Sequence, residues 1–246
     1  ILKLLARIHP VKRHDLLHFL DGLLKPALFK DYAPNGLQVE GREEILKIVC
    51  GVTACQALID RAIELGADTI LVHHGYFWKD EDPRVIGMKA TRLKSLLTHD
   101  INLIGYHLPL DAHRTLGNNM QLTQLLGCKL ANPLPEDNTD IVFETTLAKP
   151  MTGEDLAEHL SNTLSRKPLH IPADSMIQRV AICSGGAQDY IDQAIALGVD
   201  AFITGEVSEK TVHIAREANI HFYAAGHHAT ERYGIKALGE HIQSTL

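Results

Sequence analysis

Histidines and carboxylates gather at a few places in this sequence, in a pattern typical of metal ligands. The chain has 15 histidines among 246 residues. Imidazole nitrogen and carboxylate oxygen are the ligands that a borderline divalent cation takes. His227 and Glu231 are four residues apart, so they share one face if a helix begins there, and can chelate one ion. The candidate ligands are His73, His74, His107, Asp111, His227 and Glu231.

None of these short motifs is specific by itself. In a chain with 15 histidines, about one His-His pair and about two histidines with an acid four places on arise by chance. Position carries more weight, because all six candidates directly follow apolar runs that read as strands. The alternative is a set of histidines that cap helices or pack in the core, and the residue types leave both interpretations open.

Six ligands exceed what one tetrahedral ion can use. The natural solution is two ions, about 3.5 to 4 Å apart, that share Asp111 or Glu231. Few ligands per ion leave coordination positions open for water, whose pKa an ion lowers toward neutrality. The pattern therefore predicts two divalent ions per protomer (Zn, Fe, Mn, Co or Ni) and hydrolytic chemistry.

An internal repeat predicts the elements that hold these ligands. Residues 59–68 (IDRAIELGAD) match residues 191–200 (IDQAIALGVD) at seven of ten positions, 132 residues apart. Each segment has helical apolar spacing ended by glycine and lies between short apolar runs, so strand, helix, strand is expected twice. Such units resemble one another in many proteins, but duplication explains the match better. The predicted strands are 47–52, 69–72, 101–105, 179–183, 201–204 and 220–224.

We expect an α/β fold of two duplicated, intertwined halves with mixed sheets. The first half is predicted at 1–128, and the second half, 179–246, completes the core with the first. Between them, 129–178 reads as a small α+β insert for packing or subunit contact: strands at 141–148 and 168–171, and a helix after a capping-box-like pattern at Thr152. Ligands in open α/β sheets bind at the carboxyl ends of strands, where the candidate ligands fall.

A few other residues are weaker candidates. Glu206 stands in the repeat where His74 stands in the first half, so Glu206 and His228 are candidate catalytic groups, and His113 is a candidate proton shuttle. The segment 184–186 (SGG), before a helix expected at 187–197, is either a phosphate loop or an ordinary N-terminal cap. Asn35-Gly36 is first of all a turn.

Composition narrows the function classes. Thirty acidic against 24 basic residues give a net charge of −6, which provides no electrostatic footprint for nucleic acid and no polybasic membrane patch. No apolar run approaches the roughly 18 residues that cross a bilayer. The four cysteines form no CxxC pair, which favours a reducing, cytoplasmic setting.

Five motifs in order make the sequence resemble the Nif-three-like family of dinuclear metal proteins. They are 31–39 (DYAPNGLQV), 72–75 (VHHG), 106–113 (YHLPLDAH) with 117–119 (GNN), 204–206 (TGE) and 225–231 (AGHHATE). Members carry the name GTP cyclohydrolase I type II homologue. The resemblance implies an intertwined duplicated fold, a hexameric ring, and metal ligands at His73, His74, Asp111, His227 and Glu231, with His107 near the ions. Some relatives have proline where Gly75 stands here.

We therefore expect a divalent-metal-dependent hydrolase, GTP cyclohydrolase I type II-like, with a small-molecule substrate that contains a nucleotide or another phosphate. The resemblance alone implies the nucleotide. The competing interpretation is a non-enzymatic metal-binding ring that serves as a scaffold or a platform for partners. Solvent access to the ions separates the two, because an enzyme needs an open coordination position.

Overall fold

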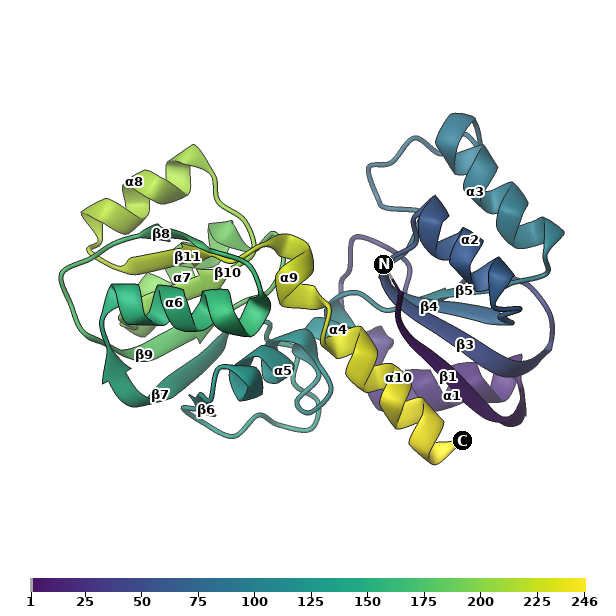
Figure 1. The fold of residues 1–246 in the computed structure, drawn as a ribbon, viewed down its shortest axis with the longest axis horizontal. Coiled ribbons are helices and arrows are strands. Elements are labelled where there is room, and N and C mark those ends of the chain that lie inside the picture. Colours follow the sequence, from purple (N-terminus) through teal and green to yellow (C-terminus); the bar gives the residue numbers. More distant parts are fainter. Residues whose placement is uncertain (1) are drawn as a thin grey trace. The chain divides into compact units, whose positions relative to one another are not determined.

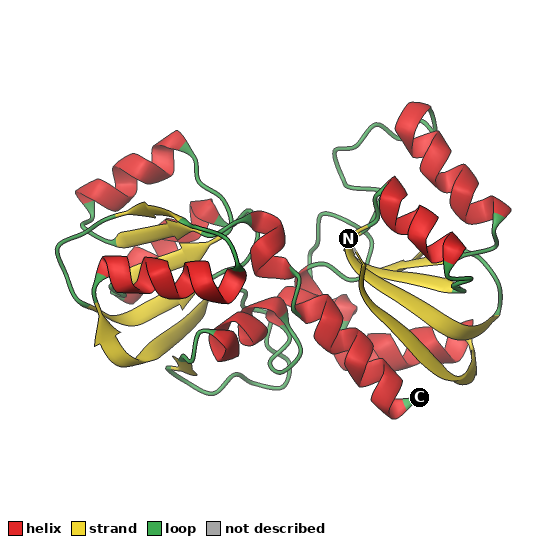
Figure 2. Cartoon of the chain, in the orientation of Figure 1, coloured by secondary structure: helices red, strands yellow, loops and turns green. Residues whose placement is uncertain are grey.

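The computed structural model describes residues 2–246, which divide into two compact units. Unit 1 comprises residues 2–110 with Gly234–Leu246, and unit 2 is Asp111–Tyr233. In each unit a mixed β-sheet is covered by helices on both faces (Figure 2). The expected α/β class with mixed sheets is thus confirmed.

The sheet of unit 1 has five strands in the order β1-β3-β4-β5-β2. Its three inner strands run parallel, and both edge strands are antiparallel to their neighbours. The parallel strands are the three that the first half of the repeat predicted. The strands are β1 (Leu2–Lys12), β2 (Gly36–Val39), β3 (Glu44–Thr53), β4 (Thr69–His74) and β5 (Asn102–Gly105).

Helices cover both faces of this sheet (Figure 1). Alternate strand residues such as Val49 and Ile70 pack against α2 and α3 on one face. On the other face α10 approaches closely, since a Cβ at Gly239 would lie 2.7 Å from the Sγ atom of Cys50. The chain therefore returns at its C-terminus to complete this core. The helices of unit 1 are α1 (Arg13–Leu24), the 3₁₀ turn Pro26–Leu28, α2 (Gln56–Glu64), α3 (Gly87–Thr98) and α10 (Gly234–Thr245).

The sheet of unit 2 has six strands in the order β6-β7-β9-β10-β11-β8. Again three inner strands, β9, β10 and β11, are parallel. They are the strands that the second half of the repeat predicted. The strands are β6 (Lys129–Leu130), β7 (Phe143–Met151), β8 (Leu169–Ile171), β9 (Ile177–Ile182), β10 (Ala201–Thr204) and β11 (His221–Ala224).

The two faces of this sheet have separate cores, as alternation along the strands requires. Ile203 and Tyr223 face α5 and α6, whereas Phe202 and Phe222 face α7 and α8. The helices are α5 (Asn118–Leu125), α6 (Gly153–Leu164), the 3₁₀ turn Gln188–Tyr190, α7 (Ile191–Leu197), α8 (Glu209–Glu217) and α9 (His227–Glu231). A further short helix, α4 (Leu108–Ala112), spans the position where the chain passes from unit 1 to unit 2.

The segment expected as an insert contributes directly to the sheet of unit 2. Its strands β7 and β8 pair antiparallel with β9 and β11, and α6 packs on one face. The Thr152 side chain caps α6 by accepting the Asp155 N–H, as its sequence pattern predicted. The compact units are bounded at other positions than 1–128, 129–178 and 179–246, because the strands of this segment hydrogen-bond to those of the repeat.

No helix among residues 2–246 combines the length and the apolar character needed to cross a lipid bilayer.

Candidate metal centre

Unit 1 brings three of the predicted ligands together. His73 and His74 are the last two residues of β4, and His107 follows β5, the parallel neighbour of β4. The ring centroids of His73 and His107 are 5.1 Å apart, and those of His74 and His107 are 5.7 Å apart. One ring nitrogen of each of the three lies within 4.8 Å of the others. The carboxyl ends of two neighbouring strands therefore build a three-histidine cluster.

Each of these imidazoles is held through Nδ1. His73 Nδ1 lies 3.0 Å from the carbonyl oxygen of Tyr106, His74 Nδ1 lies 3.2 Å from Thr53 Oγ1, and His107 Nδ1 lies 2.7 Å from Asp31 Oδ1. Histidines that bind metals usually direct Nδ1 to such a partner, which fixes the tautomer and presents Nε2 to the ion. The cluster thus has the hydrogen-bond pattern of a ligand set.

Asp31 is a functional candidate that the sequence analysis did not single out. Besides holding His107, it accepts hydrogen bonds from the N–H of Leu108 (2.9 Å) and from Asn35 Nδ2 (3.0 Å). Burial raises the pKa of Asp31, but the hydrogen bonds and the charge of His107 outweigh this and lower the pKa to about 2. Asn35 in turn accepts the N–H of His107. The motif 31–39 was the only sequence signal for Asp31, whereas Asn35 was also expected in a turn with Gly36.

Unit 2 brings the other three predicted ligands together. A helix, α9, begins at His227 as expected, and His227 Nε2 lies 3.1 Å from Glu231 Oε2. Ligand atoms at about 2.0 to 2.1 Å from a tetrahedral ion are about 3.3 Å apart, so this spacing suits two ligands of one ion. Asp111 and Glu231 are 6 % and 2 % exposed, and an oxygen of each lies within 4.8 Å of the other. Two buried carboxylates and an imidazole form this second donor set.

The loop after β9 supports these carboxylates. Ser184 Oγ donates to Asp111 Oδ1 at 3.2 Å, as does Asn118 Nδ2 at 2.8 Å. A Cβ on Gly185, whose φ is +72°, would collide with Glu231 Oε1. The backbone N–H groups of Ser184 and Gly185 already bond to Asn119 and Thr230. The segment 184–186 is therefore not the cap of α7, which begins only at Ile191, and the N–H groups of Ser184 and Gly185 and the Ser184 hydroxyl bond to partners within unit 2.

The carboxylate of Glu206 lies within hydrogen-bond distance of the His227 imidazole. Its Oε1 lies 2.7 Å from His227 Nδ1, on the ring nitrogen opposite Glu231. The hydrogen bond to Glu231 first, and that to Glu206 after it, raise the pKa of His227 to about 9 against the opposing effect of burial. Burial, and then the charges of Asp111 and Glu231, raise the pKa of the Cys183 thiol well above its usual value. Negative charge is thus concentrated where a cation would be bound.

The remaining candidates have other surroundings. His228 is exposed on α9 and lines a pocket described below. His113 Nδ1 accepts the backbone N–H groups of Thr115 and Leu116, a contact that shapes its own loop.

The donor chemistry fits divalent cations in both units. Four imidazoles are oriented through Nδ1 by a carbonyl, a hydroxyl or a carboxylate, and two carboxylates are buried. Nitrogen and oxygen donors of this kind accept several first-row metals, whose affinities differ by element. The site therefore suits borderline ions in general and selects no single metal.

The family model of Duf34/NIF3 (NGG1p interacting factor 3) matches residues 11–246. A protein of Pseudomonas aeruginosa named GTP cyclohydrolase 1 type 2 homolog is 58 % identical over 223 residues, 90 % of this chain and 88 % of the relative. A protein of Escherichia coli K12 with the same name is 55 % identical over 232 residues, 94 % of this chain and 92 % of the relative.

Two solved structures share the fold. The structure titled "Structural genomics, protein ybgI, unknown function" has a TM-score of 0.90 and 54 % identity, and the match covers 96 % of this chain and 94 % of that one. The structure of TTHA1606 from Thermus thermophilus has a TM-score of 0.83 and 31 % identity, with coverages of 95 % and 94 %. Because the family model spans nearly the whole chain and the relatives are more than half identical, this protein belongs to the Duf34/NIF3 (NGG1p interacting factor 3) family.

Proposed function

We propose that this protein is a divalent-metal-dependent hydrolase that binds two divalent ions through its six predicted ligands. The observation that carries the proposal is the same in both units: each predicted histidine ligand is fixed through Nδ1, which leaves Nε2 for an ion, and a ring nitrogen of each lies within 4.8 Å of other donor atoms. Chain connectivity adds support, because His107 and Asp111 are separated by only three residues and Asp111 lies in the helix that follows His107. Histidines in a purely structural role have no need of this arrangement.

The residues of the chain have distinct tasks in this proposal. Bound divalent ions would supply Lewis-acid activation of water. Asp31 and Glu206 keep a proton on Nδ1 of His107 and His227, so that Nε2 stays available for ligation. Glu206 is therefore a positioning residue first, although half of its side chain remains exposed and within reach of a substrate. Glu206 and His228 stay the candidates for proton transfer.

The substrate that we propose is a nucleotide or another phosphate-containing small molecule. The relatives' name, GTP cyclohydrolase 1 type 2 homolog, supports a nucleotide. For GTP the reaction would be hydrolytic opening of the imidazole ring of guanine, with water adding at C8. The hexameric ring and the cytoplasmic setting also remain predictions. Light scattering after gel filtration tests the ring, which requires a mass six times the 27.2 kDa of one chain.

Metal content and turnover test the proposal together. The parent, Asp111→Ala and Asp111→Asn are purified without an affinity tag or added metal, and metal per protomer is measured by mass spectrometry. Asp111→Asn keeps an oxygen that can accept from Ser184 and Asn118, so it separates loss of charge from loss of fold. The exposed Asp140 provides the control variant Asp140→Asn.

We expect about two ions in the parent and in the control, and fewer in both Asp111 variants, because a buried carboxylate ligand is lost. Hydrolysis in a screen that begins with GTP should fall in parallel, while circular dichroism stays unchanged. A parent that binds no common divalent ion would refute the metal centre. Two tightly bound ions with no turnover on any nucleotide or phosphate ester would instead favour the scaffold interpretation.

A further inference from the structure

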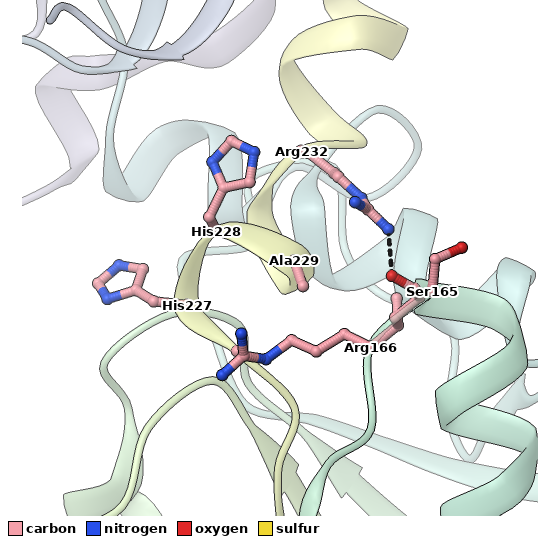
Figure 3. A pocket seen from close by; sticks show the side chains of 8 residues that line it. Ser165, Arg166, His227, His228, Ala229 and Arg232 are labelled. Atoms are coloured by element: carbon pink, nitrogen blue, oxygen red, sulfur yellow. Dashed lines mark hydrogen bonds between the residues drawn. The ribbon is translucent and has the colours of Figure 1, made fainter. Parts of the chain in front are cut away.

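A pocket of about 310 Å³ lies within unit 2, beside the candidate ligand His227 (Figure 3). Its wall is formed by the end of α6 on one side and by the beginning of α9 on the other. This volume is at the lower end of the range for small-molecule sites, and suits one group of a larger ligand. The lining residues are Leu164, Ser165, Arg166, Gly226, His227, His228, Ala229 and Arg232.

The charge of this pocket is opposite to that of the chain. Two guanidinium groups line it, and none of its lining residues carries a carboxylate. The whole chain, in contrast, has a net charge of −6. Positive charge is therefore concentrated at one small concave site, next to a residue of the candidate metal centre.

Arg166 is placed in the pocket by the way in which α6 ends. Ser165 takes a left-handed conformation (φ 50°) at the C-cap, which turns the chain so that the Arg166 side chain lies over Gly226. Gly226 has a φ of +101°, and a Cβ there would collide with Arg166 Nε. The Arg166 side chain is exposed, and no hydrogen bond or ion pair joins its guanidinium to another residue within 2–246. Its donors are thus available to a ligand.

Arg232 is held rigidly at the opposite wall. Its Nη2 donates to the carbonyl oxygen of Leu164 and to Tyr233 Oη, and its guanidinium lies 5.2 Å from the centre of the Tyr233 ring. These contacts use one of the guanidinium nitrogens, and a guanidinium carries five N–H donors in a planar fork. A fixed guanidinium loses little entropy when it binds an anion.

We propose that this pocket binds a phosphoryl group through Arg166 and Arg232, with His228 at its rim. Planar guanidinium forks match the oxygen geometry of phosphate, and charge-assisted hydrogen bonds of this kind are the stronger ones in proteins. His227 belongs to both the pocket wall and the candidate metal centre, so a phosphoryl group bound here would place the remainder of its molecule near the ions. The assignment of this phosphoryl group to the substrate rests on the proposed function, whereas phosphate binding itself does not.

Binding of inorganic phosphate and of pyrophosphate tests the inference. Affinity is measured by calorimetry at constant low ionic strength, on protein as purified and after metal removal by a chelator, with metal content determined in each sample. The variants are Arg166→Gln, which breaks no side-chain hydrogen bond among residues 2–246, and Arg166→Lys, which keeps the charge without the fork. Arg216→Gln is the matched control, because Arg216 is an exposed arginine on α8 of the same unit.

We expect saturable binding to the parent with or without metal, and a loss of roughly 10- to 100-fold in affinity for Arg166→Gln. Arg166→Lys should recover part of the loss, and Arg216→Gln should bind as the parent does. Binding that is absent from the parent, or unchanged in Arg166→Gln, would overturn the inference.

The metal measurements separate this result from that of the proposed function. Phosphate binding that disappears with the metal, yet is indifferent to Arg166, would place phosphate on the ions and refute only the arginine pocket. Binding that depends on Arg166 in a protein that takes up no metal would support the pocket and refute the metal-dependent hydrolase.

Discussion

Replacement of Asp31 by asparagine is the sharpest test of how unit 1 holds His107. The pKa of Asp31 is about 2, against an ordinary value of 3.8. At about 1.4 kcal/mol per pKa unit, this difference corresponds to roughly 2 kcal/mol of folding stability. The Asp31 side chain is only 4 % exposed, so solvent screens this contribution little. The same carboxylate holds His107 Nδ1, and loss of such a partner typically lowers metal affinity about 10- to 100-fold.

The pH dependence identifies the source of the effect. Because the pKa of Asp31 is lower in the folded than in the unfolded chain, its stabilisation is complete above pH 3.8 and disappears as the pH falls through about 2. Urea unfolding of the metal-depleted parent and D31N, followed by circular dichroism between pH 7 and pH 2, measures it. The gap in unfolding free energy between the two should narrow by roughly 2 kcal/mol as the pH falls below 4.

D31N also exchanges an accepting oxygen for a donating amide, which lowers the unfolding free energy by an amount that does not depend on pH. The pH-dependent part of the gap is therefore the quantity that tests the reasoning. The exposed Asp80 supplies the control D80N, which should follow the parent at every pH. A gap of equal size at pH 7 and pH 2 would refute the assigned role of the Asp31 charge.

Three further predictions concern unit 2. His227 has a pKa of about 9 and must lose a proton to bind metal, so metal affinity should rise by up to about tenfold per pH unit from pH 7 to pH 9. Competition with a chelator measures the metal affinity, and an affinity that does not change with pH would contradict the prediction. Gly185→Ala should displace the Glu231 side chain and lower metal content per protomer, while the circular dichroism spectrum stays native. Full metal occupancy in this variant would show that the loop after β9 moves and Glu231 stays in place. Thr152→Ala removes the cap of α6 and should lower the unfolding free energy by about 1 kcal/mol. The metal content of Thr152→Ala should equal that of the parent, and a lower metal content in this variant would show that α6 affects the metal centre.

Local sequence determined the repeated core and most of the ligand candidates. The strands at 69–72 and 201–204 are found where their apolar runs predicted, and a helix begins at His227 so that Glu231 shares its face. These features depend on residues close together in sequence, whose periodicity and capping residues act through nearest neighbours. The family resemblance extended the same motifs to a dinuclear centre, which remains a proposal.

Tertiary structure alone decided which residues support the ligands. Asp31 meets His107 across 76 positions, and Ser184 meets Asp111 across 73. Arg166 lies over Gly226 only because α6 ends beside the start of α9. The strands of the segment 129–178 extend the second sheet, and α10 returns to cover the first. No local pattern encodes such pairings, because they depend on which strands hydrogen-bond side by side and which helices cover them, and that is settled only when the whole core packs.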